Sequence, residues 1–195
     1  MDLKRALDVS VGTLALAVAA PILVGVAMAM RLSGDGGPFL YRAQRVGEGC
    51  ATITVLKIRT MADGAGGSGL TAFRDPRVTR LGGLLRRYRI DELPQLVNVV
   101  RGEMSLVGPR PEDPRFVDLS DPLHRRVFLA KPGITGPAQL RYRDEANLLT
   151  GPDFERRYRE EILPGKLLLD AQYLDERSIW VDLRILAQTI CAIAK

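Results

Sequence analysis

Apolar residues crowd the N-terminal end of the chain. No charged residue occurs between positions 9 and 30, and a run of this length matches the roughly 20 residues that a helix needs to cross a bilayer core of about 30 Å. A cleaved secretory signal fits less well, because Asp8 interrupts the approach to the run and no small-residue cleavage pattern follows it. The pattern therefore predicts a helix in the membrane.

Pro21 lies near the middle of this apolar run. Proline removes a backbone donor and clashes with the preceding turn, so we expect a kink or a break there. Lys4 and Arg5 precede the run and Arg31 follows it, so the charge bias that orients a spanning helix is nearly balanced. Two interpretations stay open on these residues: a segment that enters the membrane and returns on the same side, and a mildly kinked transmembrane helix.

The pattern changes after residue 32, where a soluble body is expected to begin. Positions 33–38 are rich in glycine and predict a turn that leaves the membrane surface. Residues 51–58 are β-branched and aliphatic with partial alternation, which indicates a strand within a short sheet around residues 38–60. Residues 62–69 contain four glycines and a serine, and such a segment is either a mobile loop that closes over a substrate or a linker.

Helical periodicity dominates much of the remaining chain. Between Val78 and Tyr88 apolar residues recur at helical spacing with arginines beside them, which predicts a basic amphipathic helix. Such a helix either lies among lipid headgroups or packs on the core with a solvated basic face. Residues 178–194 are amphipathic in the same way. We therefore expect a mixed α/β fold dominated by helices, in which an anchor at residues 1–32 and a domain at residues 33–195 form one unit.

Prolines mark a further helix start and two loops. A helix is expected to begin near Asp91, because Pro94 is tolerated in a first helical turn and apolar residues follow it at helical spacing. Residues 108–111 and 132–137 are rich in proline and glycine, which exclude regular helix. We expect rigid loops at both places, with exposed backbone amides.

Charge and residue inventory narrow the chemistry. The net charge of +5 favours anionic partners, such as nucleic acid, phosphorylated metabolites or an anionic lipid surface. Cys50 and Cys191 lie far apart, and His124 is the one histidine. This inventory excludes most zinc sites and most catalytic triads and fits a reducing compartment. We expect no metal site built by protein ligands alone, and we expect His124 to be structural or solvated.

Adjacent carboxylates at Asp91 and Glu92 are the first candidates for chemistry. At a helix start, the positive end of the helix dipole and the unpaired amides favour the ionised form, which is a competent nucleophile. Neighbours on a helix point about 100° apart, so one carboxylate can attack phosphorus while the other binds a divalent cation. Simple capping of the helix by Asp91 is the alternative.

The basic residues around these carboxylates indicate the ligand. Lys57, Arg59, Arg86 and Arg110 supply more positive charge than two carboxylates need for neutrality, which indicates a ligand rich in phosphate. Phosphoryl transfer depends mainly on positioning and on neutralising charge over the phosphoryl oxygens. Arginines and magnesium perform that task, so a chain with a single histidine remains suited to it.

Five motifs in order carry a family resemblance. The chain resembles the bacterial sugar transferases, and within them the monotopic polyprenyl-phosphate phosphoglycosyl transferases in their small form, which consists of the catalytic domain alone. The resemblance covers most of the chain. The motifs are Lys57-Ile58-Arg59-Thr60-Met61, Asp75-Pro76-Arg77-Val78-Thr79, Asp91-Glu92-Leu93-Pro94-Gln95-Leu96, Ser105-Leu106-Val107-Gly108-Pro109-Arg110-Pro111 and Lys131-Pro132-Gly133-Ile134-Thr135-Gly136.

The resemblance implies a covalent transfer in two steps. The carboxylate at Asp91 attacks the sugar-linked phosphate of a UDP-sugar and expels UMP, and polyprenyl (undecaprenyl) phosphate then collects the phosphosugar. This is the first membrane step of glycoconjugate assembly, such as exopolysaccharide synthesis, at the cytoplasmic face of the bacterial inner membrane. The implied partners are UDP-sugar, polyprenyl phosphate and membrane lipid, without nucleic acid, and a homodimer is compatible with the resemblance.

The resemblance also implies roles for individual residues. Glu92 corresponds to the ligand of Mg²⁺, the expected cofactor. The N-terminal helix corresponds to a re-entrant anchor that enters and leaves on the cytoplasmic side, which favours that interpretation of Pro21. The residues expected to bind phosphate or substrate are Lys57, Arg59, Arg86, Pro109, Arg110, Pro111, Arg143 and Asp170.

Two segments depart from the family pattern. Ala20 precedes Pro21 where many members have a Ser-Pro pair, so a hydroxyl bond to the backbone is lost while the proline still disrupts the helix. Residues 137–145 differ from the commoner Asn-Gly-Arg pattern. The resemblance therefore does not extend to the choice of sugar and nucleotide.

Two other functions are compatible with the same residues. In the first, the lipid phosphate attacks the donor directly in a ternary complex, and Asp91 serves as a base or a metal ligand. In the second, the chain is a membrane-tethered protein that binds nucleic acid or anionic lipid without chemistry. The basic stretches lack the interleaved aromatic residues that single-strand binders use for stacking, and paired carboxylates have no use in such a binder.

Overall fold

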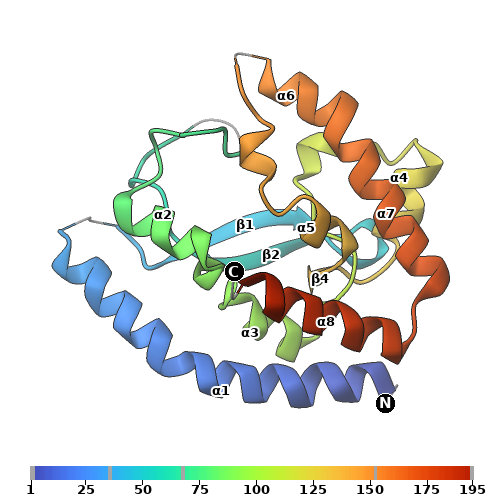
Figure 1. The fold of residues 1–195 in the computed structure, drawn as a ribbon, viewed down its shortest axis with the longest axis horizontal. Helices are drawn as coiled ribbons and strands as arrows, with labels where there is room; N and C mark the ends of the chain where they lie inside the picture. Colours follow the sequence, from blue (N-terminus) through green and yellow to red (C-terminus); the bar gives the residue numbers. More distant parts are fainter. Residues whose placement is uncertain (1–2, 35–36, 67–68, 152, 194–195) are drawn as a thin grey trace.

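The protein, seen in a computed structural model, is dominated by helices, as predicted. The structure describes residues 3–34, 37–66, 69–151 and 153–193. In Figure 1, α1 runs along the lower edge and α6 and α7 along the upper right. The elements are α1 (Leu3–Leu32), β1 (Leu40–Val46), β2 (Thr52–Ile58), α2 (Arg80–Arg87), α3 (Gln95–Arg101), β3 (Ser105–Val107), α4 (Pro122–Phe128), β4 (Gly133–Thr135), α5 (Pro137–Arg141), α6 (Phe154–Arg157), α7 (Leu163–Glu176) and α8 (Ile179–Ile193).

The apolar N-terminal run forms one helix that continues through Pro21. Its 30 residues give a length of about 45 Å. Figure 1 shows α1 as an unbroken ribbon that bends along its course, so the structure has a kinked helix rather than a break after Ala20. By length and composition α1 is a candidate membrane span, and only 11% of its most apolar window is buried.

The first turns of α1 are fastened to the body by polar side chains. The carboxylate of Asp8 is buried and accepts hydrogen bonds from Ser105 Oγ at 2.8 Å and from the Leu106 amide at 3.0 Å. Arg5 donates to the carbonyls of Val99 and Val100 in the last turn of α3. The charges that flank the apolar run thus hold α1 against the soluble body.

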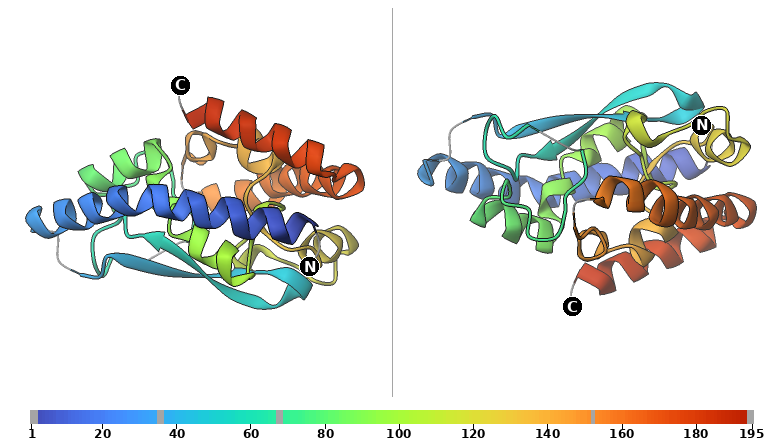
Figure 2. Two further views of the ribbon diagram at one scale, coloured as in Figure 1. Left: turned by 90° about the horizontal axis from the view of Figure 1, so that it is seen from below. Right: turned by 90° about the horizontal axis from the view of Figure 1, so that it is seen from above.

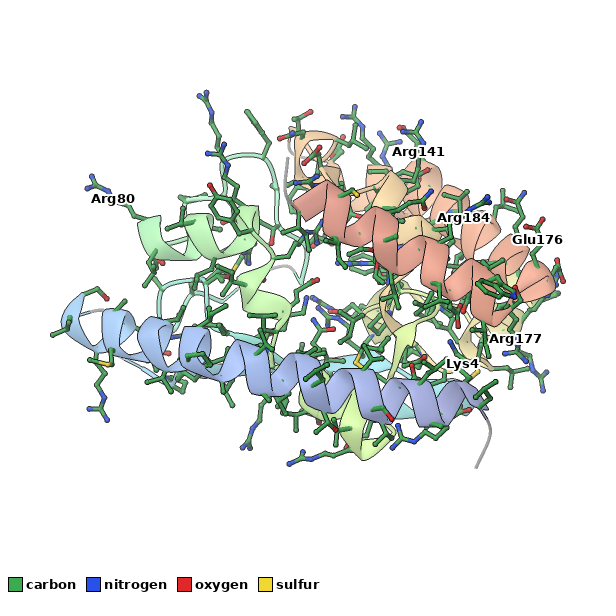
Figure 3. All side chains as sticks on the ribbon, turned by 60° about the horizontal axis from the view of Figure 1, so that its bottom comes forward. Lys4, Arg80, Arg141, Glu176, Arg177 and Arg184 are labelled. Atoms are coloured by element: carbon green, nitrogen blue, oxygen red, sulfur yellow. The ribbon has the colours of Figure 1, made fainter. Side chains whose placement is uncertain are left out.

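The far end of α1 contacts the same body through apolar side chains. Met30 packs in a small core with Ile58 of β2 and Leu85 of α2. Both views in Figure 2 show α1 running along the length of the body. Figure 3 shows Lys4 at the end of α1 nearest α8, and Arg80 extending from α2 away from the body. The two ends of α1 therefore lie against one face of the same body.

The predicted short sheet is an antiparallel hairpin of β1 and β2, paired from Leu40↔Ile58 to Val46↔Thr52. The side chain of Asn98, buried in α3, completes the outer edge of β2. Its Oδ1 accepts from the Leu56 amide at 3.0 Å, and its Nδ2 donates to the Thr54 carbonyl at 2.8 Å. Because buried backbone groups need partners, Asn98 fixes α3 against the hairpin, and α3 follows directly after the carboxylate pair.

A second small sheet pairs β3, which ends just before the loop expected at 108–111, with β4, which lies within the segment 132–137 that was expected to be a loop. β3 and β4 are parallel, with Ser105 opposite Gly133 and Val107 opposite Thr135. A Cβ added to Gly133 would lie 2.1 Å from the amide nitrogen of Gly108, so glycine is required at this crossing. The pairing brings the Pro-Arg-Pro loop next to the Gly-Ile-Thr-Gly segment.

The predicted amphipathic helices are present with slightly different ends. α2 begins after Thr79, whose hydroxyl accepts from the Gly82 amide as an N-terminal cap, and α8 spans Ile179–Ile193. The predicted turn at 33–38 and loop at 62–69 have no helix or strand in their described parts, and residues 35–36, 67–68 and 194 lie outside the described residues.

Candidate active site

The carboxylate pair lies in a short 3-10 turn, Ile90–Glu92, between α2 and α3. The prediction that a helix begins near Asp91 was wrong: α3 begins at Gln95, after Pro94, which has no N–H to continue a preceding helix. Arg89, just before the turn, has a left-handed backbone with φ of 56°, a conformation that costs energy for a residue other than glycine. This reversal turns the pair inward from the end of α2.

Glu92 is held by cations on both oxygens. Lys57 Nζ lies 3.0 Å from Oε1, and the guanidinium of Arg89 lies 3.8 Å from Oε2. Burial alone would raise the pKa of Glu92, but the positive charges of Lys57 and Arg89 outweigh it and lower that pKa to about 2. Glu92 is therefore held in its ionised form.

Asp91 behaves differently, although it is the neighbouring residue. It is buried, and its Oδ1 has no hydrogen-bond partner among the described residues. Burial and the charge of Glu92 raise the pKa of Asp91, and the positive charges of Lys57 and Arg86 oppose this shift. A helix dipole has little influence on Asp91, because the residue is not in the first turn of α3. Its ionisation depends on cations brought close to it.

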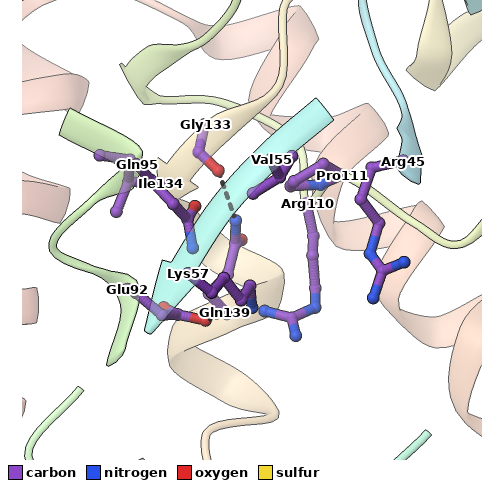
Figure 4. Close-up of a pocket in the computed structure, with 10 residues that line it drawn as sticks. All are labelled: Arg45, Val55, Lys57, Glu92, Gln95, Arg110, Pro111, Gly133, Ile134 and Gln139. Atoms are coloured by element: carbon purple, nitrogen blue, oxygen red, sulfur yellow. Dashed lines mark hydrogen bonds and ion pairs between the residues drawn. The ribbon is translucent and has the colours of Figure 1, made fainter. Parts of the chain in front are cut away.

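A small pocket lies beside the carboxylate pair. Its volume of about 20 Å³ has room for about one water molecule. Figure 4 shows Lys57, Glu92, Arg110 and Gln139 converging there, with Gln139 Nε2 donating to the Gly133 carbonyl at 3.3 Å. The lining residues are Arg45, Val55, Lys57, Glu92, Gln95, Arg110, Pro111, Gly133, Ile134 and Gln139.

The Pro-Arg-Pro loop reaches this pocket in a fixed conformation. The Pro109 carbonyl accepts from the Gly133 amide at 2.8 Å, and the Arg110 amide donates to Asp170 Oδ2 at 3.0 Å. Burial opposes the charge on Arg110, but the carboxylates of Glu145 and Glu112 outweigh it and raise the pKa of Arg110 above its usual value. Arg110 thus stays charged beside Glu92.

Four residues predicted to bind substrate are engaged in contacts with other parts of the protein. Arg59 donates to the carbonyls of Pro38 and Met61. Arg86 donates to the hydroxyls of Thr60 and Thr71 at 2.8 and 2.7 Å, and burial lowers its pKa. The guanidinium of Arg143 donates to the Ala192 carbonyl near the end of α8, and Asp170 is buried beneath the Pro-Arg-Pro loop. None of these four side chains lines the pocket.

Comparison with known proteins agrees with this geometry. The sequence matches the family model described as bacterial sugar transferase over residues 1–195. The chain belongs to the bacterial sugar transferase family. It is therefore a transferase, and its motifs Asp91-Glu92 and Pro109-Arg110-Pro111 meet in space although 17 residues separate Glu92 from Pro109 in the numbering.

Several relatives of this sugar transferase are named for their activity or their pathway. The UDP-glucose:undecaprenyl-phosphate glucose-1-phosphate transferase of Caulobacter vibrioides is 39% identical over 192 residues, which are 96% of this chain and 68% of the relative. The undecaprenyl-phosphate glucose phosphotransferase of Komagataeibacter xylinus is 41% identical over 198 residues, 96% of this chain but 35% of the relative. The exopolysaccharide production protein PSS of Rhizobium leguminosarum bv. phaseoli is 38% identical and is covered to 93%.

The residues of this sugar transferase fit a magnesium ion that is shared with a substrate. Among the described residues, no three His, Cys, Asp or Glu side chains gather as a complete metal site. Mg²⁺ is commonly held by one or two carboxylates together with substrate phosphates. Glu92 is ionised, and the partnerless Oδ1 of Asp91 lies next to it in sequence, which is the donor set that such a site needs.

Sequence reasoning missed several pocket residues. Gln95 and Gln139 lie in or just after recognised motifs, so their position alone could have indicated them. Arg45 lies on β1, where it is paired with Asp113 at 3.3 Å, and no local pattern separates it from other exposed strand arginines. Nor does any local pattern reveal Glu112, Tyr158 and Lys166, which surround Arg110 from behind.

Proposed function

We propose that the chain transfers a phosphosugar from a UDP-sugar to a polyprenyl phosphate, such as undecaprenyl phosphate, and releases UMP. One observation carries the proposal: Lys57, Glu92 and Arg110 converge on one pocket beside the buried carboxyl of Asp91. Fixed cations around a carboxylate pair suit a diphosphate whose charge must be neutralised during transfer. The relative from Caulobacter vibrioides is named for a UDP-sugar donor and an undecaprenyl-phosphate acceptor, and that from Komagataeibacter xylinus for the same acceptor.

Asp91 is the proposed nucleophile. A carboxylate oxygen of Asp91 forms a bond to the sugar-linked phosphorus, and the bond from that phosphorus to the bridging oxygen breaks, so UMP leaves with the electron pair. An oxygen of polyprenyl phosphate then attacks the same phosphorus and releases the carboxylate. Lys57 and Arg110 bind phosphoryl oxygens in both steps. Glu92 would hold Mg²⁺, which supplies further neutralisation of the diphosphate when it is bound.

The raised pKa of Asp91 is the one observation that favours a direct displacement, with Asp91 as a general base. The acceptor gives little reason for a base, because a phosphate monoester with a second pKa near 6 is already ionised at neutral pH. The cations around Asp91 lower its pKa, and a bound magnesium would do so further. The covalent route therefore remains the proposal.

The exposed face of α1 supports a membrane anchor with both ends on one side. Val11, Leu14, Val18 and Ile22 are exposed large apolar side chains that follow one stripe of the helix. Both ends of α1 contact the same body, through Asp8 and Met30 respectively. A helix that crossed the bilayer would carry one of these contacts to the opposite side. We therefore propose a re-entrant anchor on the cytoplasmic face, where a UDP-sugar donor would be available.

UMP release from a panel of UDP-sugars tests the reaction. The full chain in detergent or membranes is supplied with Mg²⁺ and a short polyprenyl phosphate, and the wild type is compared with Asp91→Asn. We expect release by the wild type, and covalent labelling of the wild type alone by a donor that carries ³²P in the sugar-linked phosphate. Unlabelled wild type with ternary-complex kinetics would contradict the covalent route, and the absence of UMP from every donor would contradict the function.

The membrane topology has a separate test. Reporter domains are fused before Met1 and after Lys195, and their accessibility is measured in intact cells and in inverted vesicles. We expect both reporters on the cytoplasmic side. Reporters on opposite sides would exclude the re-entrant anchor and leave the transfer reaction untouched.

A further inference from the structure

Helix α7 holds the Pro-Arg-Pro loop at two points. Asp170 Oδ2 accepts the amide N–H of Arg110 at 3.0 Å, and Lys166 Nζ lies 2.7 Å from Glu112 Oε1. Lys166 and Asp170 are four residues apart, so they project from the same face of the helix. Both are almost fully buried, at 1% and 2% exposure. A helix far along the chain thus contacts the backbone of Arg110 and the side chain of Glu112, two residues later.

A closed set of polar contacts surrounds the ammonium group of Lys166. It donates to Glu145 Oε2 and to the hydroxyl of Tyr158, each at 2.8 Å, and that hydroxyl donates to Glu112 Oε2 at 2.6 Å. Tyr158 opens a π-helical turn, Tyr158–Ile162, between α6 and α7. Such turns are uncommon and occur frequently at functional sites. The turn brings the Tyr158 hydroxyl between Lys166 and Glu112.

The two carboxylates in this set, Glu112 and Glu145, can pair with either Lys166 or Arg110. Glu112 and Glu145 are two buried or nearly buried carboxylates, and Arg110 Nε lies 3.8 Å from Glu112 Oε1. Lys166 lies within 2.8 Å of both carboxylates and supplies one of the two positive charges that they require. Without Lys166, two uncompensated carboxylates would attract the guanidinium of Arg110 away from the pocket, because an unpaired buried charge is strongly unfavourable.

We propose that Lys166, together with Tyr158 and Asp170, is a positioning set for Arg110. Lys166 binds the carboxylates of Glu112 and Glu145, and Tyr158 binds that of Glu112, so the guanidinium of Arg110 stays directed at the pocket. Asp170 fixes the backbone from which the Arg110 side chain extends. The set touches no substrate and acts through Arg110. This inference rests on the proposed function, in which Arg110 binds phosphoryl oxygens of the donor.

A double-mutant cycle between Lys166→Met and Arg110→Ala tests the set. Initial rates of UMP release by the full chain give kcat and KM for the donor in all four proteins, at a temperature below each melting midpoint. We expect Lys166→Met to lower kcat/KM by about 10- to 100-fold in the wild type and by less than about twofold in the Arg110→Ala background. Most of the loss should appear in KM, because Arg110 is proposed to bind the donor. KM also separates this effect from partial unfolding, since a smaller folded fraction lowers kcat and leaves KM unchanged. Equal losses in both backgrounds, or a loss confined to kcat, would overturn the proposal.

Tyr158→Phe covers the case in which Lys166→Met does not fold. It removes one hydroxyl, and we expect kcat/KM to fall by roughly 2- to 10-fold, again only where Arg110 is present. Tyr41→Phe is the matched control, because it deletes the same atom from an exposed tyrosine of β1. An unchanged KM in Tyr158→Phe, together with an unchanged KM in any folded Lys166 variant, would contradict the role.

Binding of UDP separates this inference from the proposed reaction. Calorimetric affinities for UDP are measured in the same four proteins of the cycle. If the loss of UDP affinity caused by Lys166→Met depends on the presence of Arg110, the result supports the positioning set. This holds even if no donor yields UMP, an outcome that would contradict only the proposed transfer reaction. Additive losses, or an Arg110→Ala variant that binds UDP and releases UMP like the wild type, would overturn the set and leave the reaction in place.

Discussion

Two lysine–glutamate pairs support the site, and they differ in their access to solvent. Lys57 and Glu92 lie 3.0 Å apart at the pocket, and their side chains are 22% and 13% exposed. Lys166 and Glu112 lie 2.7 Å apart, and theirs are only 2% and 8% exposed. A pair at a pocket can exchange one partner for a ligand, whereas a sealed pair cannot do so without leaving a buried charge uncompensated. The same two residue types thus suit substrate binding in one place and loop support in the other.

The surroundings explain why the two pairs differ. The open pair joins β2 to the turn just before α3, so it lies where a strand end meets the Pro-Arg-Pro loop. The sealed pair lies between α7 and the residue after that loop, next to a core formed by Tyr158, Leu163 and Leu167. Burial by apolar side chains therefore makes Lys166 inaccessible to a ligand, whereas Lys57 remains accessible at the pocket.

The largest effect is expected from Asp91→Asn, which tests whether the open pair belongs to a catalytic centre. If Asp91 is the nucleophile, UMP release should fall by about 1,000-fold or more, because an amide cannot form the covalent intermediate. Stability should be unchanged or higher, since burial raises the pKa of Asp91 and an amide avoids that cost. UMP release and thermal melting of the same preparation measure both. Turnover within about tenfold of the wild type would exclude the nucleophile.

The next effect concerns stability of the sealed pair. Lys166→Met should lower the free energy of unfolding by roughly 3–5 kcal/mol, because it leaves Glu112 and Glu145 without their buried cation. Urea titration with a helical signal measures it. Adding Glu112→Gln should restore part of the loss, as one of the two uncompensated charges is then removed. A loss below about 1 kcal/mol would mean that the pair is as weak as a surface ion pair.

Sequence periodicity predicted the elements that bury one face. α1, β2, α2 and α8 all follow from runs of seven or more residues with helical or alternating spacing. β3 and β4 were missed because each has three residues, too few to show a period, and because their motifs also contain prolines and glycines. Their pairing is a contact between distant segments, which local pattern does not contain.

The site divides in the same way. Asp91, Glu92, Lys57 and Arg110 could be named from motifs, because reactive groups occur in recognisable local order. The support behind Arg110 could not, since Tyr158 and Glu112 are 46 residues apart and belong to no shared motif. Arg59 and Arg86 were grouped with the substrate by charge and by the family resemblance, and Arg143 and Asp170 by the resemblance alone. In the structure all four make hydrogen bonds to other parts of the protein. Charge predicts the ligand class, and tertiary contacts decide which charges face it.

A pH-dependent effect is expected at Asp170, a buried acid on α7. Burial raises its pKa to about 7, against the hydrogen bond from the Arg110 amide. The folded state then holds a proton that the unfolded state releases above about pH 4, so Asp170 should make the protein less stable as the pH rises from about 4 to about 7. Asp170→Asn keeps an acceptor for the Arg110 amide and removes this titration.

We therefore expect the variant to be more stable than the wild type by about 4 kcal/mol at pH 8 and by only about 1–2 kcal/mol at pH 5. Unfolding in urea at both pH values measures the difference. The comparison is internal, because Glu112 and Lys166, which also face Asp170, are present in both proteins. A constant difference at the two pH values would show that Asp170 does not titrate in this window.

The smallest effect on stability is expected at the open pair, where it sharpens the contrast with Lys166. Lys57→Met should change the free energy of unfolding by about 1 kcal/mol or less, because Glu92 retains Arg89 at 3.8 Å and partial access to water. UMP release should nevertheless fall by roughly 10- to 100-fold, since a cation at the transferred phosphate is lost. Arg42→Met, which removes an exposed charge from the neighbouring strand, is the control and should leave both quantities unchanged. A loss of stability as large as that of Lys166→Met would mean that both pairs stabilise the fold to the same extent. The distinction between an open pair that binds the ligand and a sealed pair that supports the loop would then be wrong.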